Sequence, residues 1–166
     1  RFSCVGLGAA PNAATSFDQT TYRLRITTDL AGLLSKGLDI MEDWAHAVSF
    51  NPALEQKERG VVIEEWRTGL SAETRVQNKQ FPVMLRGSKY AVHLPIGTIE
   101  NLQHFDPKLA EQFYRDWYRP DLMTVIAVGD FDVKAMEADI RQRFGAPTMA
   151  AHPKSRPYAT LPAQDE

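Results

Sequence analysis

The stretch Gln56-Lys57-Glu58-Arg59-Gly60-Val61-Val62-Ile63-Glu64-Glu65-Trp66-Arg67 decides how this 166-residue chain is interpreted. Glu58 and Glu65 are seven residues apart. In an α-helix, which turns about 100° per residue, that spacing places the two carboxylates about 20° apart on one face. The apolar residues on the same side predict that this face is buried; they are Leu54, Val61, Val62, Gly69, Ala72 and Val76. A buried carboxylate is costly unless it is paired, protonated or bound to a metal, so we expect a partner opposite the pair.

The composition is that of an ordinary soluble globular domain. Hydrophobic residues make up 43% of the chain and charged residues 24%, and the net charge is −2. This charge gives no electrostatic reason to expect binding to nucleic acid or to an anionic membrane. No apolar run approaches the roughly 20 residues of a membrane span. Cys4 is the single cysteine, which excludes an intrachain disulfide and a thiolate metal site and leaves its own role open.

The order of predicted elements is strand, helix, helix, helix, strand, helix. Alternating and apolar runs predict strands, and apolar spacing behind capping residues predicts helices. The strands are expected over 20–28 and 122–128, and the helices over 31–48, 52–80, 108–118 and 133–144. The pattern indicates an α+β fold with a mostly antiparallel sheet and helices packed on one face. Residues 146–166 are rich in proline, alanine and polar residues and are interpreted as a linker or tail, which leaves 1–145 as the domain.

The glutamate pair has two interpretations. One glutamate could bind a metal while the other supports the site, or both could form salt bridges with arginines of a neighbouring helix. Catalytic zinc usually has three protein ligands, often two histidines and a glutamate. The histidines are His46, His93, His104 and His152, and none has a second histidine four residues away. These residues alone therefore do not complete a zinc hydrolase site.

Five ordered segments carry a family resemblance over nearly the whole chain. They are 12–22, 37–44, 58–67, 95–98 and 113–131. Together they resemble the pitrilysin/insulinase zinc metallopeptidases, whose inverted motif is His-x-x-Glu-His. The Glu-Trp-Arg version at Glu65 is most similar to bacterial exported members. The resemblance implies a metallopeptidase half-domain located in the bacterial periplasm or exported.

The resemblance also implies roles for individual residues. Glu65 corresponds to the zinc-binding glutamate, and Glu58 to the acidic residue that supports the catalytic site. Asn12, Ala13 and Ala14 correspond to the edge strand along which substrate peptides lie, a mode that binds extended peptides through their backbone. The family usually has an aromatic residue where this chain has Ala14, so one substrate contact differs.

At the family's spacing, the His-x-x-Glu-His motif would fall before Arg1. We therefore expect a fragment of the first catalytic-type domain that lacks its N-terminal strand and His-x-x-Glu-His helix. The intact protein is expected to be a zinc endopeptidase, and the fragment to be inactive and to bind no zinc. The alternative is a non-catalytic structural or substrate-binding homologue of the same fold. Expected partners are peptide substrates and the remaining domains of the parent chain or a partner subunit. Self-association through exposed strand edges is also expected.

Overall fold

The computed structural model describes residues 13–145 and 153–158, and these residues divide into two compact units. The first unit contains residues 13–14, 20–49, 111–145 and 153–154, and the second contains 15–19, 50–110 and 155–158. Asn12, Cys4, His152 and most of the predicted tail lie outside the described residues.

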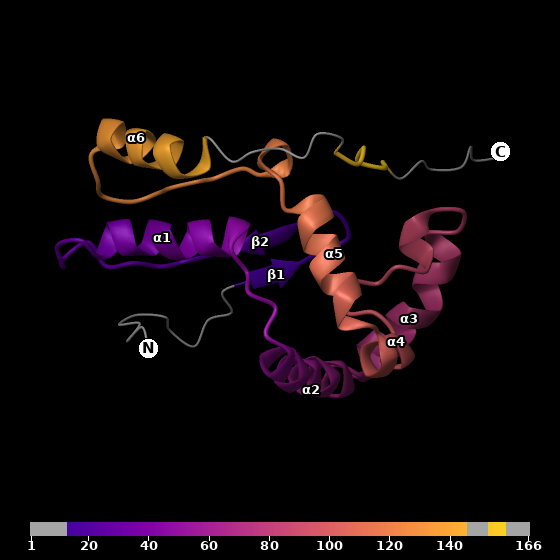
Figure 1. The fold of residues 1–166 in the computed structure, drawn as a ribbon. Coiled ribbons are helices and arrows are strands. Elements are labelled where there is room, and N and C mark those ends of the chain that lie inside the picture. The colour runs from indigo at the N-terminus through magenta and orange to yellow at the C-terminus, as the bar shows by residue number, and fades with distance from the viewer. Residues whose placement is uncertain (1–12, 146–152, 159–166) are drawn as a thin grey trace, which may run out of the picture. The chain divides into compact units, whose positions relative to one another are not determined.

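The elements, labelled in Figure 1, are mostly helical. In chain order they are β1 (Ala13–Thr15), β2 (Thr20–Tyr22), α1 (Leu33–His46), α2 (Pro52–Thr68), α3 (Ala72–Met84), the 3₁₀ turn η1 (Lys89–Ala91), α4 (Ile99–His104), α5 (Pro107–Trp117), the 3₁₀ turn η2 (Pro120–Leu122) and α6 (Val133–Phe144). The predicted helices over 31–48, 108–118 and 133–144 are confirmed to within two residues at each end.

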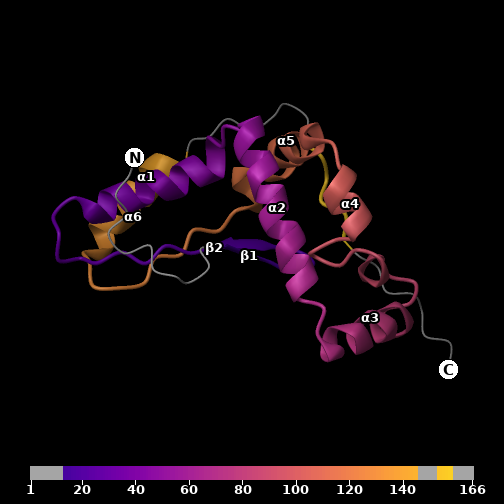
Figure 2. The same ribbon diagram turned by 90° about the horizontal axis from the view of Figure 1, so that it is seen from below.

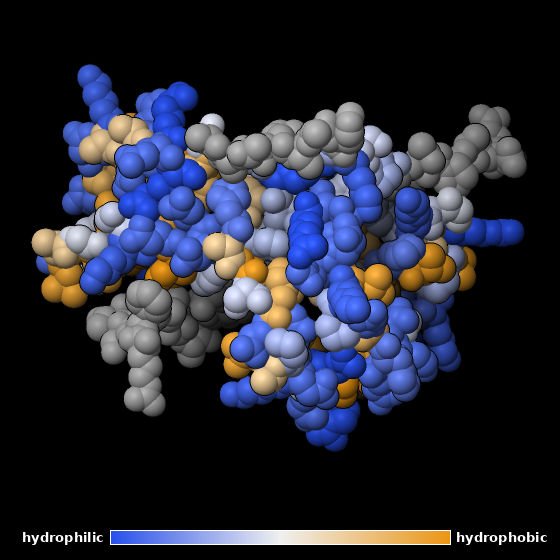
Figure 3. Space-filling view, viewed as in Figure 1, coloured by the Kyte–Doolittle hydropathy of each residue, from blue (hydrophilic) through white to orange (hydrophobic). Residues whose placement is uncertain are grey.

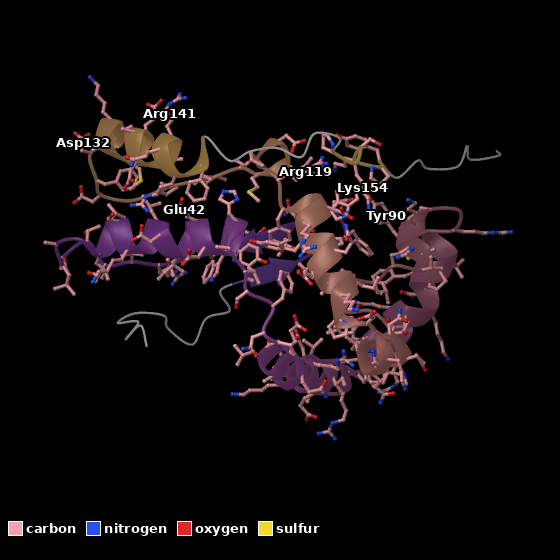
Figure 4. All side chains as sticks on the ribbon, in the orientation of Figure 1. Glu42, Tyr90, Arg119, Asp132, Arg141 and Lys154 are labelled. Carbon is pink, nitrogen blue, oxygen red and sulfur yellow. The ribbon has the colours of Figure 1, made fainter. Side chains whose placement is uncertain are left out.

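In the first unit, α1 and α6 lie side by side (Figure 1). Leu38 of α1 and Met136 of α6 are the only buried hydrophobic residues among the described ones, with 8% and 7% exposure. Arg143 near the end of α6 reaches back to α1, where its guanidinium pairs with Asp39 and lies 3.3 Å from Glu42. Figure 4 shows Glu42 between the two helices. The charge cluster around Arg143 and the ring contact of His46 with Phe144 thus join these helices.

Two extended segments in the first unit show alternating exposure. Leu24 and Ile26 are half-buried. A Cβ added to Gly37 of α1 would lie 1.8 Å from Ile26 Cδ1, so the extended segment packs closely against α1 at a position where the helix has a glycine. In the segment 123–128, Ile126 is 80% and Val128 is 91% exposed. Each segment therefore has one face toward the protein and one toward solvent.

The prediction of a mostly antiparallel sheet overstated the strand content. Among the described residues, one sheet is present and it has two strands, β1 and β2. The predicted strand over 20–28 is paired only over Thr20–Tyr22; of the predicted strand over 122–128, Leu122 ends η2 and 123–128 is extended but pairs with no described strand. A run of apolar, β-branched residues specifies an extended backbone, whereas a sheet also needs a neighbouring strand to accept and donate its hydrogen bonds.

Four aromatic side chains form a cluster that joins β2, α1 and the end of α5. The hydroxyl oxygens of Tyr22 and Tyr118 are 2.6 Å apart, and Tyr114 donates its hydroxyl proton to the Trp44 carbonyl oxygen at 2.9 Å. The rings of Tyr22 and Trp44 have centroids 5.6 Å apart. Burial raises the pKa of Tyr22 and of Tyr114, because the charged phenolate is poorly solvated there.

We expect the first unit to lose stability as the pH rises above about 10, the ordinary pKa of tyrosine. The folded state holds the protons of Tyr22 and Tyr114 to a higher pH than the unfolded state does. The resulting stabilisation is complete below the unfolded pKa and is lost as pH rises above it. Denaturant titrations followed by circular dichroism at several alkaline pH values would measure this loss. Tyr22→Phe should lose less stability over the same range, and an unchanged pH dependence would contradict the assignment.

Residue 154, in the predicted tail, is held against the end of α5. Arg119, only 7% exposed, donates to the Lys154 carbonyl oxygen at 2.7 Å, and the Lys154 ammonium lies 2.5 Å from Asp116. Both Arg119 and Lys154 are labelled in Figure 4. These contacts give one point of the predicted tail a defined place in the first unit.

In the second unit, the predicted single helix over 52–80 is two helices. Helix α2 ends at Thr68, and α3 begins after Ser71, whose hydroxyl accepts a hydrogen bond from the Thr74 amide at 3.1 Å. A serine that caps a new helix competes with continuation of the old one. Proline disfavours the interior of a helix, yet α3 continues through Pro82 to Met84. The short helix α4 was not predicted, although Thr98 caps it.

The surface carries many apolar side chains. Figure 3 shows hydrophobic residues interspersed with hydrophilic ones on the face in view. More than half of each of the side chains of Leu54, Val61, Val83 and Val92 is exposed. Within residues 13–145 and 153–158, every helix is too short or too polar to cross a membrane.

Candidate metal and substrate site

Helix α2 carries both glutamates of the candidate site, and local sequence explains where it begins. The Asn51 side-chain oxygen accepts from the amides of Ala53 at 3.0 Å and Leu54 at 3.3 Å. Pro52 occupies the first helical position, where its missing N–H costs nothing. Both signals are readable from the sequence. The helix places Glu58 and Glu65 on the same face, as the seven-residue spacing predicts.

The face that bears the pair is exposed, so the prediction of a buried face is wrong. Glu58 and Glu65 are both exposed, and on their side Leu54 is 64% and Val61 is 52% exposed. The half-buried residues of α2 point mostly about 40–140° away, around the helix axis, from the direction of the glutamate pair; they are Glu55, Arg59, Val62, Ile63 and Trp66.

Arg59 accounts for this rotation. Its guanidinium donates to the carbonyl oxygens of Gln103 at 3.1 Å and Phe105 at 2.9 Å, at the end of α4. It also lies over the Phe105 ring, 4.5 Å from the centroid. Carbonyls at a helix C-terminus lack intrahelical donors and attract a cation. Arg59 therefore turns one side of α2 toward α4 and leaves the glutamate pair outside the contact. The sequence contained the signal, an arginine next to Glu58, but not its target.

No described residue forms a hydrogen bond or ion pair with the carboxylate of Glu58 or Glu65. The alternative interpretation, a pair held by arginines of a neighbouring helix, is therefore not seen here. Glu64 differs, because Arg67 donates to it at 3.0 Å and holds the pKa of its carboxyl below the usual value. Two unpaired carboxylates on one helical face are chemically suited to hard or borderline cations such as zinc. Their oxygens alone are fewer than a catalytic zinc requires.

The histidines are dispersed. His46 ends α1 and is half-buried, with its ring centroid 6.0 Å from that of Phe144. His104 is part of α4, with its Nδ1 2.9 Å from the Glu100 carbonyl oxygen, and His93 is exposed. Across the part of the chain that is described, no three histidine, cysteine or acidic side chains gather as a metal site would need.

Of the predicted substrate edge, two residues are described. Ala13 and Ala14 belong to β1 and are exposed, and β1 pairs with β2 on one side. Within the described residues, neither alanine makes a backbone hydrogen bond outside this pair of strands. An exposed strand with one unpaired side can add another extended chain. Asn12, the third predicted residue, lies outside the described residues.

A solved structure resembles this chain in fold. The crystal structure of the first half of the periplasmic protease PqqL from Escherichia coli has a TM-score of 0.83 and 31% identity to this chain. The match covers 96% of this chain and 34% of that one.

The relatives found by sequence comparison are much longer than this chain. It is 37% identical to the probable zinc protease PqqL of Haemophilus influenzae over 79% of its own length and 14% of the relative's. It is 34% identical to a zinc protease PQQL-like protein of Arabidopsis thaliana over 96% of its own length and 17% of the relative's. The chain therefore spans about one sixth of these relatives or less.

Two family models match in tandem. Residues 104–165 match the model described as the inactive domain of peptidase M16. Residues 5–91, more than half of the chain, match the model of insulinase, peptidase family M16. These matches show that the chain belongs to the insulinase family of peptidases, family M16.

Proposed function

We propose that this chain supplies the glutamate-bearing part of a zinc-dependent endopeptidase. The observation that carries the proposal is the pair Glu58 and Glu65, unpaired and exposed on one face of α2 in a member of a peptidase family. Bound zinc would polarise a scissile carbonyl and lower the pKa of a water molecule. Glu65 would hold the metal, and Glu58 would orient the site without touching the metal.

Ala13, Ala14 and Asn12 would bind the peptide. Backbone pairing along β1 would hold an extended substrate with little sequence preference, and neighbouring side chains would select among substrates. The small side chain of Ala14 leaves more space beside the peptide than an aromatic residue would. Because the similar E. coli protein is called periplasmic, we also place the parent protein in the bacterial periplasm or outside the cell.

The test uses the intact protein and the 166-residue chain side by side. The intact protein should cleave a quenched fluorescent peptide, lose activity when a chelator removes the metal, and recover it with zinc. The isolated chain should cleave nothing and bind zinc only weakly, because the described residues offer no third ligand. Activity of the intact protein that survives complete metal removal would overturn the proposal.

The second candidate is a non-catalytic homologue that binds peptides without cleaving them. The match of residues 104–165 to an inactive domain of the family favours it. The same assay separates the two candidates. An intact protein that binds the peptide, contains no stoichiometric zinc and produces no cleavage would support the non-catalytic role.

We further propose that the isolated chain self-associates through the extended segment 123–128. This segment carries no charge and exposes Ile126 and Val128, so two copies can pair without repulsion. The other extended segment carries Arg23 and Arg25, which would repel their counterparts in a second copy. Ile126→Lys should shift sedimentation toward the monomer. Val83→Lys, at a 73% exposed site on α3, is the matched control and should not.

A further inference from the structure

Tyr90 connects two parts of the second unit that are far apart in sequence. From η1, its hydroxyl donates to both carboxylate oxygens of Asp18, at 3.0 and 2.8 Å, across 72 residues. The Tyr90 ring also contacts Phe17, with centroids 4.9 Å apart. Tyr90 is labelled in Figure 4. The bond to Asp18 is the largest cause of the raised pKa of Tyr90, so the hydroxyl keeps its proton and remains a donor.

Both partners of Tyr90 lie in the turn that joins β1 to β2. The turn covers residues 16–19 and is closed by the Ser16 amide, which donates to the Gln19 carbonyl oxygen at 2.8 Å. Each strand has only three residues, and a hairpin of two such strands is marginally stable by itself. The hairpin therefore depends on contacts beyond its two strands, made by Tyr22 of β2 and by its turn.

The other end of this connection is firmly held. Ser88, which precedes η1, is 8% exposed, and its hydroxyl donates to the Leu85 carbonyl oxygen at 2.7 Å. The Ala91 amide donates to the Ser88 carbonyl oxygen, and η1 packs against α3. Figure 2 shows the helical part of the second unit from below, with α2, α3 and α4 in view. Tyr90 thus ties the hairpin turn to a fixed point beside α3.

We propose that Tyr90 is a positioning residue for peptide binding along β1, acting through Asp18 and Phe17 without touching the substrate. This inference rests on the proposed function, because β1 matters only if a peptide pairs with it. A strand that is already ordered loses less conformational entropy when a peptide is added. Loosening the turn should therefore weaken peptide binding and leave the chemical step, which depends on Glu65, unchanged.

The test is Tyr90→Phe in the intact protein, which removes the hydroxyl and keeps the ring against Phe17. We expect KM for an extended peptide of about ten residues to rise roughly three- to tenfold, as fits the loss of one hydrogen bond to a charged group at a partly exposed site, with kcat unchanged. Tyr158→Phe, at a 76% exposed tyrosine of the same unit, is the matched control and should change neither parameter. In Asp18→Asn, a further Tyr90→Phe change should add little, because both remove one interaction.

A second measurement separates failure of this inference from failure of the proposed function. Amide hydrogen exchange of residues 13–16 should be faster in Tyr90→Phe than in the wild type, whether or not the protein is a peptidase. If Tyr90→Phe speeds exchange but the intact protein has no peptidase activity, the proposed function is refuted while the role of Tyr90 in holding the hairpin turn stands. Unchanged exchange, or a fall in kcat with KM unaltered, would overturn the positioning role of Tyr90.

Discussion

Replacing Glu65 by Gln in the intact protein is expected to lower kcat/KM by a factor on the order of 10³ or more, together with loss of bound zinc. A catalytic metal contributes several kcal/mol of transition-state stabilisation, and each ~1.4 kcal/mol corresponds to a tenfold rate. The neutral amide is a weaker zinc ligand than the carboxylate it replaces. Peptidase kinetics and zinc content by elemental analysis measure the two losses together.

Glu64→Gln is the matched control for this experiment. Glu64 is the adjacent residue, points about 100° away on the helix and is paired with Arg67. Its replacement should leave both zinc content and kcat/KM close to the wild-type values. The kcat/KM of Glu58→Gln should lie between those of the other two variants. We expect a loss of about 10- to 100-fold, the usual effect of removing a group that orients a ligand. Equal losses from Glu64→Gln and Glu65→Gln would refute the assignment of Glu65.

Replacing Leu38 by Ala should destabilise the first unit by about 2–4 kcal/mol, the usual cost of removing a buried leucine side chain. Leu38 is 8% exposed, and Met136 is the other buried hydrophobic residue among the described ones. So small a core leaves little to compensate for a cavity. Urea unfolding followed by the fluorescence of Trp44, on the same helix, measures the change.

Leu54→Ala on α2 is the control for Leu38→Ala. Leu54 is 64% exposed, so its truncation should change the free energy of unfolding by no more than about 0.5 kcal/mol. Periodicity alone predicts that both leucines are buried, and only the fold distinguishes them. Equal destabilisation by the two substitutions would show that the face of α2 bearing Leu54 is covered in solution.

Helix positions were the most predictable part of this fold. The helices over 133–144 and 31–48 follow from apolar spacing and from short-range stop and start signals, such as Asp132, which accepts from the Ala135 amide at 2.8 Å. The break between α2 and α3 was missed because Gly69 and Ser71 are compatible with a continuing helix until Ser71 captures the Thr74 amide. Where short-range signals allow a helix either to continue or to end, packing with other parts of the protein decides between the two.

Some features of the candidate site were predictable from the sequence and others were not. The common face of Glu58 and Glu65 was predictable, because covalent geometry and helical pitch set the angle between two residues of one helix. Which face of α2 is packed was not, because Arg59 finds its carbonyl partners at Gln103 and Phe105, more than 40 residues along the chain. The link between Tyr90 and Asp18 spans 72 residues and was equally invisible.

The sequence by itself determined helices α1, α5 and α6, the family and the spacing of the glutamate pair, all of which depend on residues within a few positions of one another or on motifs in a fixed order. Only the tertiary structure decided that the pair is exposed and unpaired, that 122–128 remains outside a sheet, and that the hairpin turn is tied to η1. The physical reason is that burial, strand pairing and long-range hydrogen bonds each need a partner whose position local sequence does not specify.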